Sequence, residues 1–241
     1  MLISHLTYAG QEPEQSSEKE VSRFRILFTI NQVLETRTFS ETTTFPLFLE
    51  EGTSKRTYET SPGKAFNIGA LYSITPGFGI MGGFELFATN QVGGLKIAAP
   101  HPLFFQSSRI AETTVPSLNY QEKILYLDAV ISIVRPKIIF DLFGGPSLFY
   151  IDTDLLASGD FNSEYPFDAI NIVNTPKQKR KDNPIGFNVG IALTYRITEV
   201  VGFIFQARLN KARANVERNG ANTLDFDVGG FRVGGGIQIQ F

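Results

Sequence analysis

The sequence contains no cysteine and no tryptophan, and only two histidines and two methionines among its 241 residues. Without cysteine the chain has no disulfide, no thiolate metal site and no cysteine nucleophile. Its net charge of −2 creates no strong positive field, so we expect no nucleic-acid partner. No apolar run approaches the roughly 18 residues of a membrane-spanning helix, whereas the short alternating strands of a membrane barrel need no such run.

Phenylalanine and glycine are abundant, with 22 of each, and they lie in segments where apolar residues alternate with small or polar ones. The segment 185–196, IGFNVGIALTYR, has Ile, Phe, Val, Ile, Leu and Tyr at its odd positions. A strict period of two over twelve residues indicates a strand with one apolar face. By this criterion we predict eight strands, within 24–31, 66–74, 78–86, 125–134, 138–150, 185–196, 201–210 and 231–241.

The connections between these strands alternate in length. Three are very short, at 75–77, 135–137 and 198–199. Between them run long polar segments at 35–63, 90–119 and 152–183, and a shorter fourth connection that contains the hairpin signal Asn219-Gly220. With eight strands both termini fall on the side of the tight turns. Outer-membrane barrels have this asymmetry, with short periplasmic turns and long external loops.

The two faces of the strands indicate which of them meets lipid. The second face is mostly Gly, Asn, Ser, Thr and Gln, which is too uncharged for a typical solvated exterior but suits the narrow interior of an eight-stranded barrel. An open sheet edge is too costly in lipid, so the first and last strands must pair. We therefore predict an all-β fold, an eight-stranded antiparallel up-and-down transmembrane β-barrel, in which Phe241 ends the closing strand at the membrane interface.

The N-terminal region is expected to lie outside this barrel. Residues 1–10, MLISHLTYAG, lack the basic and apolar regions of a full signal peptide, and residues 11–20, QEPEQSSEKE, are polar and acidic. We divide the chain into 1–21, a leader remnant or flexible segment, and 22–241, the barrel domain.

Two stretches resemble a known family. Residues 126–136, YLDAVISIVRP, and 143–151, FGGPSLFYI, are similar to the central hairpin of small outer-membrane barrels of the porin-family or PorT-like type, with the pattern Y-L-E-I-P-L-L-L-K-Y followed by A-G-P-S-x-G-Y. Asp128 stands at the position of the family's Glu, and 145–147 matches its G-P-S. Ala129 and Val130 depart from the I-P pair, and Phe149 replaces a Gly.

The resemblance implies an OmpA- or OmpX-like barrel in a Gram-negative outer membrane, with both termini in the periplasm. Its expected partners are outer-membrane lipid and the insertion machinery, and the C-terminal residues Ile237, Ile239 and Phe241 resemble the signal which that machinery reads. The family is functionally diverse and some members assist protein secretion, so the resemblance implies little about activity. We expect a monomer.

Several charged residues share the inward parity of the predicted strands: Arg25, Glu85, Asp128, Asp141, Arg196, Arg208 and Arg232. Charges in a narrow tube should pair, because an unpaired buried charge is costly. One hypothesis is therefore a structural ion network that fills the lumen. The alternative is a narrow or gated channel.

Enzymatic signals are weak, and we expect no catalysis, cofactor or metal. His5 lies in the probable leader, and His101 lies between prolines in the second long connection. The external loops are the expected functional surface, serving a scaffold or anchor that binds a protein partner and assists secretion or envelope integrity. Within them, KQKRKD at 177–182 is interpreted as a solvated charged tip, or alternatively as a site for anionic lipopolysaccharide. A soluble lipocalin-like barrel around a small apolar ligand is the alternative of a different class.

Overall fold

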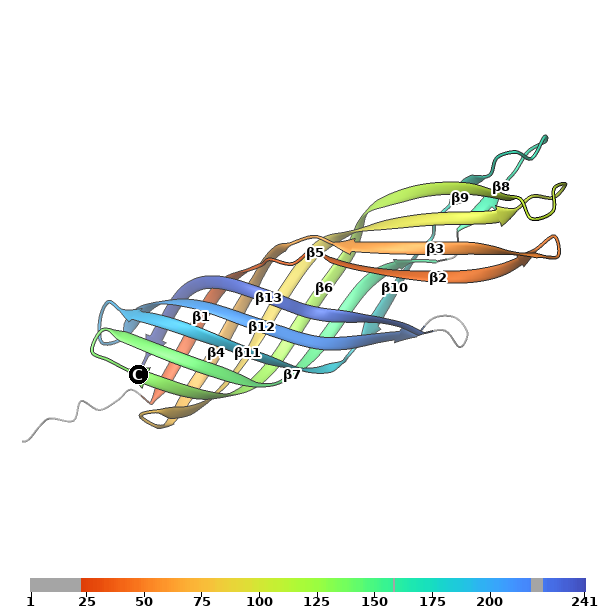
Figure 1. The fold of residues 1–241 in the computed structure, drawn as a ribbon. Helices are drawn as coiled ribbons and strands as arrows, with labels where there is room; N and C mark the ends of the chain where they lie inside the picture. The colour runs from red at the N-terminus through yellow and green to blue at the C-terminus, as the bar shows by residue number, and fades with distance from the viewer. Residues whose placement is uncertain (1–22, 158, 218–222) are drawn as a thin grey trace, which may run out of the picture.

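A computed structural model describes residues 23–157, 159–217 and 223–241 (Figure 1). The predicted N-terminal segment and the Asn219-Gly220 turn lie outside these residues. The described residues contain no helix that is long and apolar enough to span a membrane. Their strands are β1 (Phe24–Val33), β2 (Arg37–Leu47), β3 (Glu50–Thr60), β4 (Gly63–Thr75), β5 (Phe78–Pro100), β6 (Ser108–Val134), β7 (Ile138–Leu156), β8 (Asp160–Asn162), β9 (Asn171–Asn174), β10 (Lys177–Asp182), β11 (Ile185–Arg196), β12 (Val201–Glu217) and β13 (Thr223–Gln240).

Eight of these strands form a closed antiparallel ring in the order β1, β4, β5, β6, β7, β11, β12, β13 and back to β1. The ring closes between β1 and β13, which pair from Arg25 opposite Gln240 to Val33 opposite Arg232. Beyond the strand, the Phe241 amide donates to the Phe24 carbonyl at 2.9 Å. The predicted eight-stranded up-and-down barrel is therefore confirmed, and so is the pairing of its first and last strands.

The exterior of the ring is apolar and its interior is polar, as the alternation predicts. Phe187, Phe203 and Ile237 are each about half exposed, at 52%, 51% and 46%. Asn188 and Gln238, which alternate with such residues, are buried. The apolar face therefore points away from the lumen, which argues against a soluble barrel that encloses an apolar ligand.

Three connections of the ring are tight turns, at 75–78, 134–138 and 196–201, and they lie at the end that carries Phe241 (Figure 1). At the other end, several strands continue far beyond the apolar band. β6 has 27 residues, which at about 3.3 Å per residue and a tilt of about 40° span roughly 70 Å along the barrel axis. A bilayer with its headgroups is only about 40–45 Å thick, so a large part of β6 belongs to an extension beyond it.

The three long polar connections contain strands, and this extends the sequence-based description. The β2–β3 hairpin adds to the sheet through pairing of β3 with β5, from Thr53 opposite Ala98 to Thr60 opposite Gln91. The first long connection therefore forms a hairpin that extends the sheet. In the third connection, β10 pairs with β7, from Lys177 opposite Leu156 to Asp182 opposite Ile151. The interpretation of 177–182 as a loop tip was thus wrong, because its backbone is a sheet strand.

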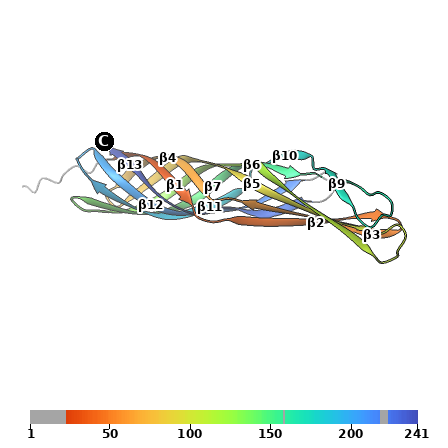
Figure 2. The same cartoon turned by 90° about the horizontal axis from the view of Figure 1, so that it is seen from above.

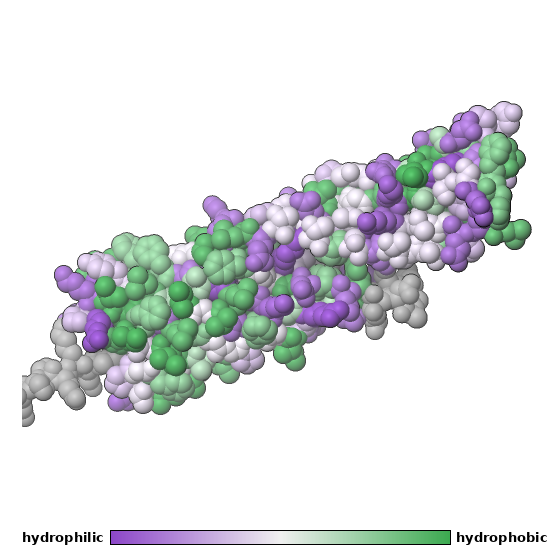
Figure 3. Space-filling model, in the orientation of Figure 1, coloured by the Kyte–Doolittle hydropathy of each residue, from purple (hydrophilic) through white to green (hydrophobic). Residues whose placement is uncertain are grey.

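Polarity reverses along single strands where the barrel passes into the extension. On β12 the outward residues change from Phe203, Phe205 and Leu209 to Lys211, Arg213 and Asn215. The inward residues of the same strand change from Gln206, Arg208 and Asn210 to Ala212, Ala214 and Val216. The surface view shows the same change: apolar surface is concentrated on the half that carries the tight turns, the surface beyond it is largely polar, and apolar surface returns at the far tip (Figure 3). The extension is therefore built like a water-soluble β-protein, with an apolar core and a polar exterior.

The core of the extension packs in the space enclosed by the strands. It includes Tyr58, Phe87, Leu118, Phe149, Leu155 and Phe226, all at least 94% buried. On one side the free edge of β2 lies next to β13, and the two meet through side chains: the Phe39 ring stacks on Phe226 with centroids 4.4 Å apart. Seen from above, the molecule is a narrow rod with the chain terminus Phe241 at one end and the β2–β3 and β8–β9 tips at the other (Figure 2).

Candidate functional site

The lumen of the barrel is occupied by polar side chains that are joined in levels along its axis. Nearest to Phe241, Arg25 of β1 donates from Nη1 to Asp141 Oδ2 at 2.8 Å and from Nη2 to Asp141 Oδ1 at 3.1 Å. Ser132 Oγ donates to Asp141 Oδ1 at 2.5 Å. Arg25 and Asp141 are both almost fully buried, so the charges satisfy one another away from water.

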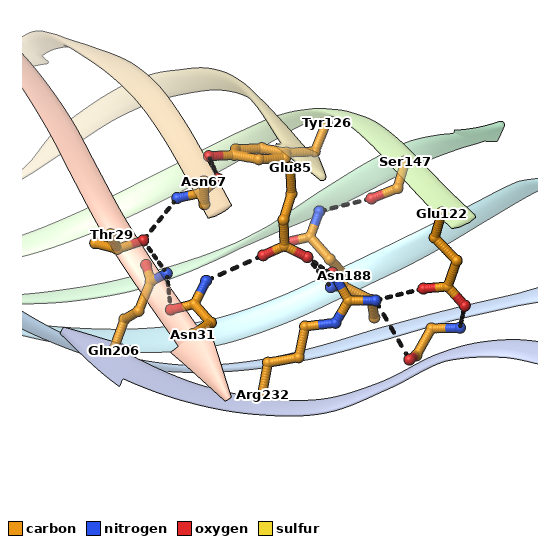
Figure 4. Close-up of polar contacts among 12 residues, drawn as sticks. Thr29, Asn31, Asn67, Glu85, Glu122, Tyr126, Ser147, Asn188, Gln206 and Arg232 are labelled. Atoms are coloured by element: carbon orange, nitrogen blue, oxygen red, sulfur yellow. Dashed lines mark hydrogen bonds and ion pairs between the residues drawn. The ribbon is translucent and has the colours of Figure 1, made fainter. Parts of the chain in front are cut away.

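The next level is a chain of amides and hydroxyls (Figure 4). Tyr126 donates to Asn67 Oδ1 at 2.8 Å, and Asn67 donates to Thr29 at 3.1 Å. Gln206 donates to Thr29 and to Asn31 Oδ1 at 2.8 and 2.9 Å. The Tyr126 hydroxyl lies where a Cβ on Gly83 or on Gly69 would come too close to it. These glycines thus make room for the tyrosine, which is a close-packing role and not phosphate binding.

Asp128 lies beside this chain and meets a cation and an amide. Asn188 donates to Asp128 Oδ1 at 2.6 Å and to Ser147 at 2.9 Å. Arg208 Nη2 lies 3.7 Å from Asp128 Oδ2. The Arg208 guanidinium also lies 3.9 Å from the centroid of the Tyr126 ring, a cation–π contact.

A third ionic level lies where the barrel passes into the extension, and it joins four strands. Arg232 of β13 forms ion pairs with Glu85 and with Glu122, the second at 2.5 Å. Glu122 also accepts from Arg37 Nη1 at 2.5 Å and from the Tyr120 hydroxyl at 2.6 Å. Glu122 and Arg232 have no exposed side-chain surface, which makes this the most deeply buried ionic cluster among the pairs described above.

Six of the seven charged residues predicted to point into the lumen thus lie in three pairs: Arg25 with Asp141, Arg208 with Asp128, and Arg232 with Glu85. Arg196 lies apart, at the mouth beside the tight turns. Its Nη2 donates to the carbonyls of Arg135 and Pro136 at 2.5 and 2.7 Å. It also lines a cavity of about 790 Å³ that opens at this end.

Sequence reasoning missed Glu122, Arg37 and Tyr120. Glu122 shares the inward parity of Asp128, so extending the alternation of β6 by a few residues would have found it. Arg37 gives no such signal, because it lies on β2, which is outside the ring.

The residues proposed as the C-terminal insertion signal lie on the outside of the closing strand. Ile237 and Phe241 are 46% and 66% exposed, and Ile239 is half-buried. The Phe241 ring lies 6.3 Å from that of Phe24. The insertion role of these residues stays a prediction.

The distal end of the extension is the second candidate site. Six exposed apolar side chains gather on its three tips, and we refer to them as the distal crown: Phe48, Leu49, Leu103, Phe104, Phe105 and Tyr165. The tips are tied together, because the Gln106 amide donates to Glu50 Oε2 at 3.1 Å and Arg109 donates to the Phe167 carbonyl at 3.1 Å.

His101 belongs to the support of the distal crown. It is buried, and its Nδ1 accepts hydrogen bonds from the amides of Leu103 and Phe104 at 3.0 and 3.2 Å. Its Nε2 lies 3.8 Å from Asp168. These contacts hold the 101–107 loop in shape. Across the described ranges, no group of three or more His, Cys, Asp or Glu residues could hold a metal ion.

Comparison with known proteins gives resemblance in shape only. No family model and no curated protein matches the chain. Among solved structures, Neisserial surface protein A has a TM-score of 0.43 and 12% identity, covering 90% of this chain and 97% of that one. Ail of Yersinia pestis, solved with the heparin analogue sucrose octasulfate, has 0.39 and 9%, covering 90% and 99%. The outer membrane protease OmpT of Escherichia coli has 0.38 and 10%, covering 91% and 94%.

Proposed function

We propose that this protein is a non-enzymatic, non-conducting barrel of a Gram-negative outer membrane, and that it anchors a rigid extension which binds a protein partner at its far end. The barrel provides the anchor, because its exterior is a continuous apolar band and its backbone has no open edge in that band. The tight turns and the chain terminus lie on the periplasmic side in this proposal, and the extension projects outward.

The observation that carries the proposal is that buried side chains fill the lumen at successive levels along the barrel axis. Arg25, Arg208 and Arg232 are 3%, 2% and 0% exposed, and each meets a carboxylate from another strand. Above them the apolar core of the extension continues the filling, with Phe87 and Phe149 at 0% exposure. These side chains leave the barrel a packed rod, which suits an anchor better than a channel.

The test is conductance of the folded protein in planar lipid bilayers. We expect no steps above background, and folding is checked on the same sample by its migration in gels without boiling. Steady ion conductance by the folded wild type would overturn the non-conducting anchor in favour of a narrow channel. A sample of the protein that stays in the soluble fraction of cells would overturn the membrane location.

A further inference from the structure

We propose that the distal crown is a docking site for a protein segment whose apolar side chains are bordered by lysine or arginine. This inference rests on the proposed function, since the crown has to face outward from the membrane to meet a partner. Its apolar side chains are far more exposed than packing requires: Leu49 is fully exposed, Tyr165 is 83% exposed and Phe105 is 77% exposed. They lie at the end of the molecule opposite the barrel, where lipid of the host bilayer does not cover them (Figure 1).

The backbone of the first tip shows that apolar residues are kept at a position that disfavours them. Leu47 pairs with Glu50, so Phe48 and Leu49 are the two central residues of a hairpin turn. Both have positive φ, 52° and 63°. Turns of this kind strongly favour Asn-Gly, because residues other than Gly, Asn and Asp seldom adopt positive φ. The two side chains make the turn less stable, and Leu49, at full exposure, contributes no buried surface in return, which points to a contact outside the chain.

The charge around the crown selects the kind of partner. The rim carries four exposed carboxylates, Glu51, Asp160, Glu164 and Asp168. The segments 45–52, 100–108 and 159–176, which build this end, contain no lysine or arginine. The cation that follows the second segment, Arg109, is buried and donates to the carbonyls of Phe167 and Pro100, so it offers no exposed positive charge to a partner. An apolar centre with an acidic rim is complementary to an apolar segment with a basic border. The same rim repels the phosphates of lipopolysaccharide or of an anionic membrane.

The crown is also held in place before any partner arrives. The second tip is joined to the first through Gln106 and Glu50, and to the third through Arg109 and the Phe167 carbonyl. Preorganised apolar groups bind with a smaller loss of conformational freedom than groups on independent loops. The three tips therefore act as one surface.

The experiment uses the full chain in nanodiscs and two fluorescein-labelled peptides of twelve residues. One alternates leucine and phenylalanine with lysine, and the other has glutamate in place of every lysine. Fluorescence anisotropy should show that the basic peptide binds at least about tenfold more tightly than the acidic one. A crown variant, Phe48→Asn with Leu49→Gly and Phe105→Ser, should lose about tenfold in affinity for the basic peptide. This variant places the favoured residues in the turn, so loss of binding does not reflect loss of folding.

Two further variants separate the crown from general acidity. Glu51→Gln with Glu164→Gln removes two rim charges, and should weaken binding of the basic peptide severalfold. Asp225→Asn with Asp227→Asn removes two exposed charges from β13, away from the crown, and should leave affinity unchanged. Equal binding by wild type and crown variant would overturn the proposal, and so would crown-dependent binding of phosphatidylglycerol vesicles. These readouts are independent of conductance, so a non-conducting barrel without crown binding would leave the anchor function standing.

Discussion

Glu122 is the residue on which the buried ionic cluster depends, since it meets Arg37, Arg232 and Tyr120 at once. Replacing Glu122 with Gln leaves the buried guanidinium of Arg232 and the partly buried guanidinium of Arg37 without their shared anion. We expect a loss of about 3–5 kcal/mol in the free energy of unfolding, measured by urea denaturation of the protein in lipid vesicles. Glu112→Gln is the matched control on the same strand, because its pair with Lys96 is exposed, and it should cost about 0–1 kcal/mol. Similar losses for both variants would contradict the assigned importance of the cluster.

Tyr120, in the extension, gives this cluster a dependence on pH. Burial raises the pKa of Tyr120 well above its ordinary value of 10, and the charge of Glu122 raises it further. Burial lowers the pKa of Arg37, but Glu122 and Tyr120 raise it more, so Arg37 stays charged throughout. Above pH 10 the folded state keeps a proton on Tyr120 that the unfolded chain has lost. Stability should therefore fall as pH rises from about 10 towards the folded pKa.

The measurement is the melting temperature by circular dichroism between pH 8 and pH 11.5, for wild type and Tyr120→Phe. Lysines titrate in both proteins, so the difference between their curves isolates Tyr120. We expect the wild type to lose more stability than the variant above pH 10. Parallel curves would show that the hydroxyl contributes nothing to the pH dependence.

The boundary between the membrane-facing barrel and the water-exposed extension lies within single strands. On β12 it can be tested by introducing arginine at one outward position on each side of the boundary. Phe205→Arg places a cation near the middle of the apolar band and should cost about 2–4 kcal/mol of unfolding free energy in vesicles. Asn215→Arg places it on the same outward parity but in the extension, where a charge faces water. It should change stability by less than about 0.5 kcal/mol. Equal effects at both sites would place the boundary elsewhere.

The same boundary explains which elements the sequence could predict. The eight ring segments were found because each separates an apolar exterior from a polar lumen, so alternation is strong. In the extension the roles of the faces reverse, and residues 37–47, RTFSETTTFPL, show few apolar residues between their Thr, Ser and Glu. Their inward Phe39 and Phe45 pack on the core, but two phenylalanines in a polar segment resemble a loop. The turn at Phe48-Leu49 lacks every usual turn residue, so the hairpin gave only a weak signal.

The lumen network was predicted to the extent that parity could predict it. Six of the seven charged residues that parity placed in the lumen form ion pairs. Which of them pair with one another could not be assigned from the sequence, because pairing depends on how the strands are staggered around the ring. Arg25 and Asp141 come from β1 and β7, which are not neighbours in the sheet. The long connections that carry the crown were expected to be the functional surface, but the crown itself was not predicted, since it is formed by three tips that are distant in sequence.

The two ends of the molecule are proposed to lie on opposite sides of the outer membrane. Because the chain contains no cysteine, single introduced thiols can report this orientation. Ser107→Cys introduces one thiol beside the crown, and Glu199→Cys introduces one at the tight turns. In intact cells a membrane-impermeant maleimide should label the first variant and not the second, and both should react after the outer membrane is permeabilised. Labelling of only Glu199→Cys in intact cells would reverse the proposed orientation.

Closure of the ring also dictates when the protein can assemble. On one side β1 pairs with β13, and Arg25 lies opposite Gln240, which is far from it in the sequence. The first strand is synthesised well before the last one. A partial ring in the hydrocarbon core of a membrane would expose two edges with unpaired backbone amides and carbonyls. The ring can therefore be completed only after β13 has been synthesised, when its backbone becomes available to pair with β1.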